Sequence, residues 1–108
     1  MSHLNIEERE GIDGIVLDLS GDIIFGDANT ALRNGIRNRL KDGKINITLN
    51  LKEVGYLDSS GIGELISALT AVSREGGKMV ILNPGERIQR LFEISKLTEI
   101  FEIERTED

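Results

Sequence analysis

The chain has 108 residues, a common size for one compact domain, and it contains no cysteine, which excludes disulfides, thiolate metal sites and thiol nucleophiles. Hydrophobic residues make up 39% and charged residues 30%, a balance typical of a folded chain. The formal net charge of -6 disfavours binding to nucleic acid or to anionic lipid, because the long-range field repels phosphate.

No apolar run reaches the length of a signal peptide or of a membrane span. We therefore expect a cytoplasmic protein with no direct membrane insertion. We also expect residues 1–108 to form a single domain, with a solvated tail over about residues 104–108.

The first part of the chain predicts a hairpin and then a helix. Apolar residues alternate around residues 4–6 and again over residues 15–19, and Asp13-Gly14 between them is typical of a tight turn. These two strands should pair antiparallel. Asp27 is then expected to cap a helix whose apolar residues recur every fourth position over residues 28–40.

The second part alternates strands and helices. Strict alternation over residues 45–51 predicts a strand with one buried face, and an apolar stripe over residues 62–72 predicts a helix. A short strand at residues 79–82 follows. Asn83-Pro84 is expected to begin a third helix, and residues 100–103 add a final strand or short docking segment.

This order of elements predicts an α/β fold. We expect a small single-layer mixed sheet of four to five strands, mostly parallel, with an antiparallel hairpin at its edge. The helices should pack mainly on one face of that sheet.

The segment that follows the third strand is the most informative for function. Ser59 and Ser60 lie between the carboxyl end of a strand and the amino end of a helix, where unpaired N–H groups and the helix dipole favour negative charge. Asp58 can act as a helix cap, which is the commoner role of an aspartate at such a position. Gly61 and Gly63 serve either a tight turn or the close approach of a partner.

Ile23, Ile24 and Phe25 form a second candidate surface. This apolar segment precedes the first predicted helix and is either a protein-binding patch or part of the core. Of the two interpretations, core packing is slightly favoured.

Enzymatic activity is not expected. The only histidine is His3, in a terminus that we expect to be frayed, so a serine nucleophile lacks a base. The glycines of the Gly61-Ile62-Gly63 segment lack the third glycine of a dinucleotide-binding loop, because Ile66 occupies its place. We therefore expect no catalytic residue, no cofactor and no metal site.

The segment Asp58-Ser59-Ser60-Gly61-Ile62-Gly63 resembles the signature loop of the STAS domain, in the anti-sigma-factor antagonist family. Residues 19–23 and 77–83 resemble two strands of that family, so the resemblance extends over nearly the whole chain and implies a STAS-like fold.

The resemblance also implies a partner-switching cycle. The unphosphorylated protein, a monomer when free, would bind an anti-sigma factor that is also a serine kinase and thereby release a sigma factor. The kinase would inactivate it by phosphorylating Ser59, and a phosphatase acting on phosphoserine would restore it. The implied partner-binding residues are Asp58, Ser59, Ser60, Gly61, Ile62 and Gly63, with Ile23, Ile24 and Phe25 beside them.

Two alternatives stay open on the sequence alone. Ser60, at a position where the family varies, is a second candidate for phosphorylation. The chain is alternatively a non-catalytic STAS scaffold, or a regulatory subunit of a larger signalling assembly or of a membrane transporter.

Overall fold

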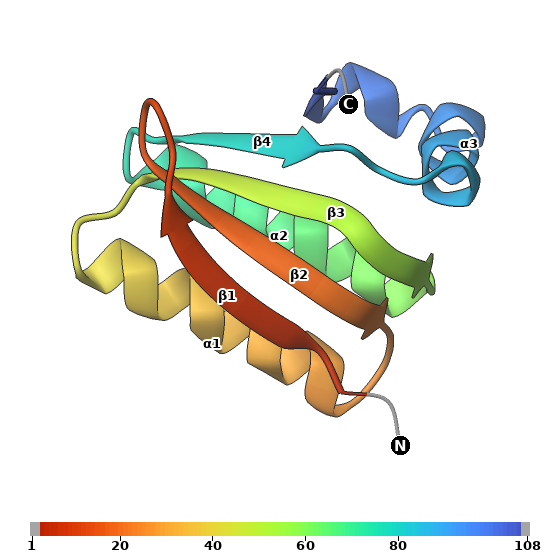
Figure 1. Cartoon of the computed structure of the whole chain (residues 1–108), viewed down its shortest axis with the longest axis horizontal. Helices are drawn as coiled ribbons and strands as arrows, with labels where there is room; N and C mark the ends of the chain where they lie inside the picture. Colours follow the sequence, from red (N-terminus) through yellow and green to blue (C-terminus); the bar gives the residue numbers. More distant parts are fainter. Residues whose placement is uncertain (1–2, 107–108) are drawn as a thin grey trace.

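The computed structural model describes residues 3–106 of the chain. Strands and helices alternate along most of it (Figure 1). In chain order the elements are β1 (Asn5–Glu10), β2 (Ile15–Ile23), α1 (Asp27–Lys41), β3 (Asn46–Leu57), α2 (Ser59–Arg74), β4 (Lys78–Leu82), α3 (Glu86–Ile94), a 3-10 turn (Leu97–Glu99) and β5 (Glu102–Glu104).

The five strands form one sheet in the order β1-β2-β3-β4-β5. β1 pairs antiparallel with β2, and the other neighbouring pairs are parallel. A hydrogen bond of 2.7 Å from Gly11 N to Gly14 O closes the turn between β1 and β2, which confirms the predicted hairpin. The mixed, mostly parallel sheet expected from the sequence is confirmed.

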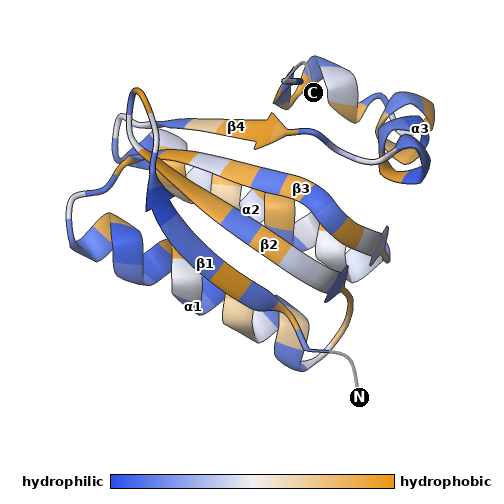
Figure 2. Ribbon diagram, in the orientation of Figure 1, coloured by the Kyte–Doolittle hydropathy of each residue, from blue (hydrophilic) through white to orange (hydrophobic). Residues whose placement is uncertain are grey.

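Both α1 and α2 cover the same face of the sheet (Figure 1), as right-handed crossovers between neighbouring parallel strands require. Hydrophobic residues alternate with polar ones along the central strands (Figure 2), and one set faces the helices. Leu17, Leu49, Leu65 and Ile81 are fully buried in this layer. α3 extends the same core through Phe92, whose ring centroid lies 5.4 Å from that of Phe101.

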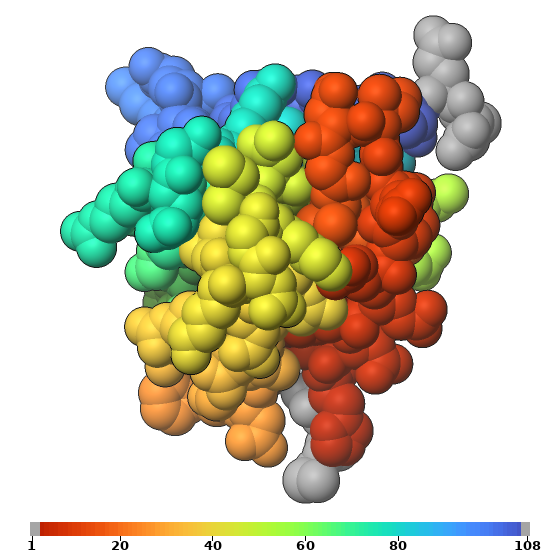
Figure 3. Space-filling model, turned by 90° about the vertical axis from the view of Figure 1, so that its left-hand side faces the viewer, coloured from red at the N-terminus to blue at the C-terminus, as the bar shows by residue number. Residues whose placement is uncertain are grey.

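The edge strand β1 is held by ion pairs to α1 and to the connection that follows it. The space-filling view shows β1 in red beside α1 in orange and yellow (Figure 3). The Glu8 carboxylate lies 2.7 Å from Lys44 Nζ and 3.0 Å from Arg39 Nε. These two cations lower the pKa of Glu8.

The third strand is longer than its sequence pattern predicts. Instead of ending near residue 51 it continues to Leu57. Its register with β2 shifts twice, since β3 contributes one extra residue at each shift. These bulges interrupt the alternation, so that Val54 and Leu57 reach the core at intervals of three residues.

Two predicted helix caps are corrected. Asp27 is the first residue of α1, and its N-cap is Gly26, whose φ of 110° suits glycine. α3 begins at Glu86 rather than at Pro84, because Asn83 turns the chain with a φ of 53° before the helix starts.

Residues 104–106 of the predicted tail are exposed, and Glu104 and Thr106 are hydrogen-bonded to the connection between β4 and α3. Asn83 N donates to the Glu104 carbonyl at 2.9 Å, and Asn83 Oδ1 accepts from Thr106 N at 2.9 Å. Residues 107–108 of the predicted tail lie outside the described residues.

Candidate functional site at the amino end of α2

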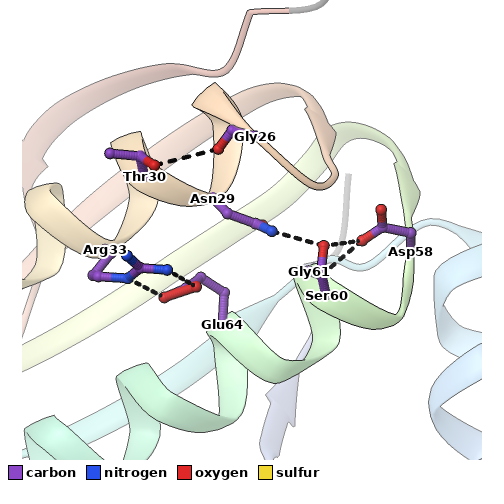
Figure 4. Close-up of polar contacts among 8 residues, drawn as sticks. All are labelled: Gly26, Asn29, Thr30, Arg33, Asp58, Ser60, Gly61 and Glu64. Atoms are coloured by element: carbon purple, nitrogen blue, oxygen red, sulfur yellow. Dashed lines mark hydrogen bonds and ion pairs between the residues drawn. The ribbon is translucent and has the colours of Figure 1, made fainter.

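The serine segment lies where β3 ends and α2 begins (Figure 4). Parallel pairing sets Ile23, the last residue of β2, beside Leu57, the last residue of β3. The connections that leave these strands therefore start side by side, and Asp58 N lies 3.4 Å from the Ile23 carbonyl oxygen. This is the carboxyl edge of the parallel strands, where α/β folds commonly place their sites.

Asp58 is the N-cap of α2, which confirms the capping interpretation. Its Oδ1 accepts from the Ser60 hydroxyl at 2.6 Å and from Gly61 N at 2.8 Å, while its Oδ2 accepts from Phe25 N at 3.0 Å. These donors, the Ser60 hydroxyl foremost, lower the pKa of Asp58. Asp58 is therefore ionised at neutral pH and ties the β2–α1 connection to α2.

The two neighbouring serines have different surroundings. Ser60 is half-buried; its hydroxyl donates to Asp58 Oδ1, and its oxygen accepts from Asn29 Nδ2 at 2.7 Å (Figure 4). Ser59 is exposed, and its side chain makes no hydrogen bond with any residue in the described part of the chain. Ser59 thus presents an unengaged hydroxyl, whereas the hydroxyl of Ser60 is held by two partners.

Asn29 belongs to this site, and the sequence analysis missed it. It lies in α1 and is only 6% exposed, and the single hydrogen bond of its side chain in residues 3–106 is the one to Ser60. A signal was available, because Asn29 precedes Leu32 by three residues and Ile36 by seven, which places an amide on the apolar stripe of the helix.

The two glycines of the segment have separate roles. Gly61 is buried, and an added Cβ would collide with the carbonyl oxygen of Ile23, so its close approach is to this chain's own backbone. The inclusion of Gly61 in a partner-contacting surface is therefore corrected. Gly63 is exposed, and no atom of the described residues lies within 4 Å of a Cβ added there.

The apolar segment before α1 divides between core and surface. Ile23 is fully buried, so its place among the partner-contacting residues was wrong. Phe25 is 84% exposed, which overturns the preference for core packing at that position. Ile24 is half-buried, as is Ile62 on α2. The residue that carries this exposed ring is thus joined to Asp58 through its backbone N–H.

An ion pair joins α1 to α2 near the serines (Figure 4). Arg33 contacts Glu64 through two hydrogen bonds, Nε to Oε1 at 2.9 Å and Nη2 to Oε2 at 2.8 Å. The Arg33 guanidinium lowers the pKa of Glu64 and balances its charge. The unbalanced carboxylate beside Ser59 is therefore that of Asp58.

The chemistry available here is that of a hydroxyl at the amino end of a helix.

In residues 3–106, no cluster of three or more His, Asp or Glu side chains is arranged to hold a metal ion. None of the helices that the structure describes is long and apolar enough to cross a membrane.

The comparisons with known proteins agree with this architecture. The STAS domain family model matches residues 3–108. The anti-sigma-B factor antagonist of Listeria monocytogenes is 33% identical over 107 residues, which cover 96% of this chain and 90% of that protein. The protein of the same name from Bacillus subtilis is 29% identical over 101 residues, which cover 94% of this chain and 91% of that protein.

The fold also matches solved structures. A crystal structure of an anti-sigma factor antagonist from Mycobacterium paratuberculosis superposes with a TM-score of 0.82 at 20% identity, over 96% of this chain and 87% of that chain. At this identity the likeness concerns the fold. Because the family model covers almost the entire sequence, the chain belongs to the STAS domain family.

Proposed function

We propose that this protein is an anti-sigma-factor antagonist whose binding to an anti-sigma factor is switched by phosphorylation of Ser59. The observation that carries the proposal is the contrast between the serines: Ser59 is exposed and unengaged among the described residues, and Ser60 is held by two partners. The names of the Listeria and Bacillus relatives, which align over nearly the full chain, support the same function.

Exposed groups around Ser59 form the proposed docking surface. Phe25 supplies an exposed ring, Ile62 a half-buried side chain, and Gly63 a stretch of backbone that no side chain covers. Burying an aromatic ring at an interface is among the strongest contributions to binding. We propose that the partner covers Phe25, Gly63 and the Ser59 hydroxyl together.

Phosphorylation changes the charge of this surface more than it changes the fold. A phosphate on Ser59 adds a charge of about -1.5 to -2 next to the ionised Asp58. Within the chain, the amino end of α2 offsets this by about 0.3 to 1 kcal/mol, so the domain stays folded. In the complex, two adjacent anions lose their hydration, and a loss of about 2.7 kcal/mol weakens binding a hundredfold.

The cycle also needs a kinase and a phosphatase. We propose that the bound anti-sigma factor is itself the serine kinase, and that a phosphatase acting on phosphoserine restores the free form. The proposed cycle takes place in the cytoplasm, with residues 1–108 acting as a single domain that is a monomer when free.

The decisive experiment mixes the purified chain with a candidate anti-sigma kinase and ATP and locates the phosphate by mass spectrometry. We expect phosphate on Ser59. Ser59→Asp should weaken binding to the same kinase at least about a hundredfold in titration calorimetry. Ser67→Asp, on the exposed side of the same helix, is the matched control and should bind like the wild type.

A negative result separates the alternatives. If Ser59→Asp binds as tightly as the wild type, the switch is wrong, and a scaffold or regulatory-subunit role takes its place. Phosphate on Ser60 alone keeps the cycle but overturns the assignment of its site.

A further inference from the structure

We propose that Asn29 determines which of the two adjacent serines is phosphorylated, by holding the Ser60 hydroxyl against Asp58 and so leaving Ser59 as the reactive one. This inference rests on the proposed function and adds to it a residue that selects the site. Asn29 acts through Ser60 and is therefore a positioning residue.

The first step of the argument concerns the Ser60 hydroxyl. A hydroxyl has one proton to donate and two lone pairs that accept. In Ser60 the proton is directed at Asp58 Oδ1, 2.6 Å away, and one lone pair accepts from Asn29 Nδ2 at 2.7 Å. Both contacts are short, and they hold the oxygen between α1 and the cap of α2 (Figure 4).

The second step concerns what phosphoryl transfer requires. The attacking serine oxygen forms a bond to the γ-phosphorus of ATP, the bond from that phosphorus to the β-phosphate oxygen breaks to release ADP, and the hydroxyl proton passes to a base of the kinase. The oxygen therefore needs a lone pair that the γ-phosphate can reach and a proton that is free to pass to that base. Ser59 is exposed and meets both requirements. Ser60 is half-buried, directs its proton at Asp58 and has one of its two lone pairs occupied by Asn29.

The third step is that a contribution to stability does not explain why an asparagine occupies position 29. Asn29 is 6% exposed, and its Oδ1 is buried without a hydrogen-bond partner among residues 3–106. A buried acceptor that lacks a donor destabilises the fold. A leucine of similar shape would avoid this cost, so the feature that distinguishes asparagine at this position is its bond to Ser60.

The test uses kinase and ATP on three purified variants, with the phosphate located by mass spectrometry. Ser59→Ala should accept no phosphate, because Asn29 still holds Ser60. The double variant Ser59→Ala/Asn29→Leu should regain phosphorylation, now on Ser60. Ser59→Ala/Asn34→Leu, which changes an exposed asparagine of the same helix, is the control and should stay unmodified.

A second readout distinguishes positioning from ordinary packing. Asn29→Leu should melt at the same temperature as the wild type or higher, since it removes an unpaired acceptor. In nuclear magnetic resonance of the wild type, the Asn29 side-chain amide should exchange slowly with solvent. Ser60→Ala should accelerate that exchange, and Ser59→Ala should not.

Three results would overturn the inference. One is Ser59→Ala that is phosphorylated on Ser60 as fast as the wild type is on Ser59. Another is a folded double variant that stays unmodified although the wild type is phosphorylated on Ser59. The third is an Asn29 amide whose exchange responds equally to both serine variants. If the wild type accepts no phosphate, the proposed function fails together with this inference. If the wild type is phosphorylated on Ser59 and one of the three results is found, only the inference fails.

Discussion

The amino ends of α2 and α3 are built differently. At α2, Asp58 caps the helix and its carboxylate receives three hydrogen bonds, from the Ser60 hydroxyl and from two backbone N–H groups. At α3 the N-cap is Gly85, and no side chain in the described part of the chain caps the helix. The end that carries the candidate serine is the one whose cap is a side chain, and this side chain also binds the β2–α1 connection.

This difference indicates why the proposed phosphorylation switch would belong at α2. A phosphate added to a mobile helix end could turn away from a partner, but a phosphate on Ser59 would stay beside the anchored Asp58. Charge added at a fixed position has a fixed effect on docking. Four predictions test how much the fixed geometry of α2 matters, from the largest expected effect to the smallest.

Gly61→Ala should have the largest effect. The new Cβ would collide with the Ile23 carbonyl oxygen, so the contact between β2 and α2 must open, and the free energy of unfolding should fall by about 3 kcal/mol. Gly63→Ala is the matched control. Its Cβ enters open space within the helix, and it should raise the free energy of unfolding by up to about 1 kcal/mol. Urea titration of both variants checks the pair, and equal destabilisation would contradict the structure.

Asp58→Ala should come next. It removes the cap of α2 and leaves the donors of Phe25, Ser60 and Gly61 without their acceptor, so the melting temperature should fall by several degrees. Asp27→Ala is the comparison, because Asp27 lies in the first turn of α1 and makes no side-chain cap in residues 3–106. Calorimetry should show a smaller loss for Asp27→Ala, and the reverse order would refute the capping role.

The pH dependence should be smaller and confined to acid. Because the pKa of Asp58 is lowered in the folded state, its stabilisation is present above the unfolded pKa and is lost as the pH falls through the folded value, below about pH 4. Ser60→Ala removes the foremost donor, so the pKa of Asp58 should rise toward its ordinary value. Carbon-detected titration of the Asp58 carboxyl measures this shift, with Ser67→Ala as a variant that should leave it unchanged.

Phe25→Ser should have the smallest effect on folding. The ring is 84% exposed, so the free energy of unfolding should change by no more than about 0.5 kcal/mol. Affinity for the anti-sigma partner should nevertheless fall, because the ring belongs to the proposed docking surface. A binding titration measures the affinity and a urea titration measures the free energy of unfolding. A large loss of stability would show that Phe25 packs in the core.

Much of the fold was predictable because its signals are local. Apolar residues alternate over residues 45–51, which is the period of a strand, and they form a stripe over residues 62–72, which is the period of a helix. The backbone geometry of each element imposes its period. The Asp13-Gly14 turn is read from two residues. Where β3 acquires two bulges the period fails, and the prediction stopped at residue 51 instead of Leu57.

The candidate site was predictable only in part. Asp58 was expected as a cap, since a cap needs nothing beyond the next three residues of its own helix. Ser59 was preferred to Ser60 only through the family resemblance, because the contact that distinguishes the two serines comes from Asn29, thirty-one positions before Ser60 in the chain. The same limit applies to Ile23 and Phe25, whose burial depends on how β2 meets α2.

The sequence by itself determined the order of strands and helices, the hairpin at the edge of the sheet and a capped helix that begins with two serines. Each of these depends on residues within a turn or a few positions of one another. The tertiary structure decided which hydroxyl is free, which glycine is irreplaceable and which apolar side chain faces solvent. Those properties depend on where β2 and α1 lie against α2, and no local pattern encodes a contact between residues that meet only after folding.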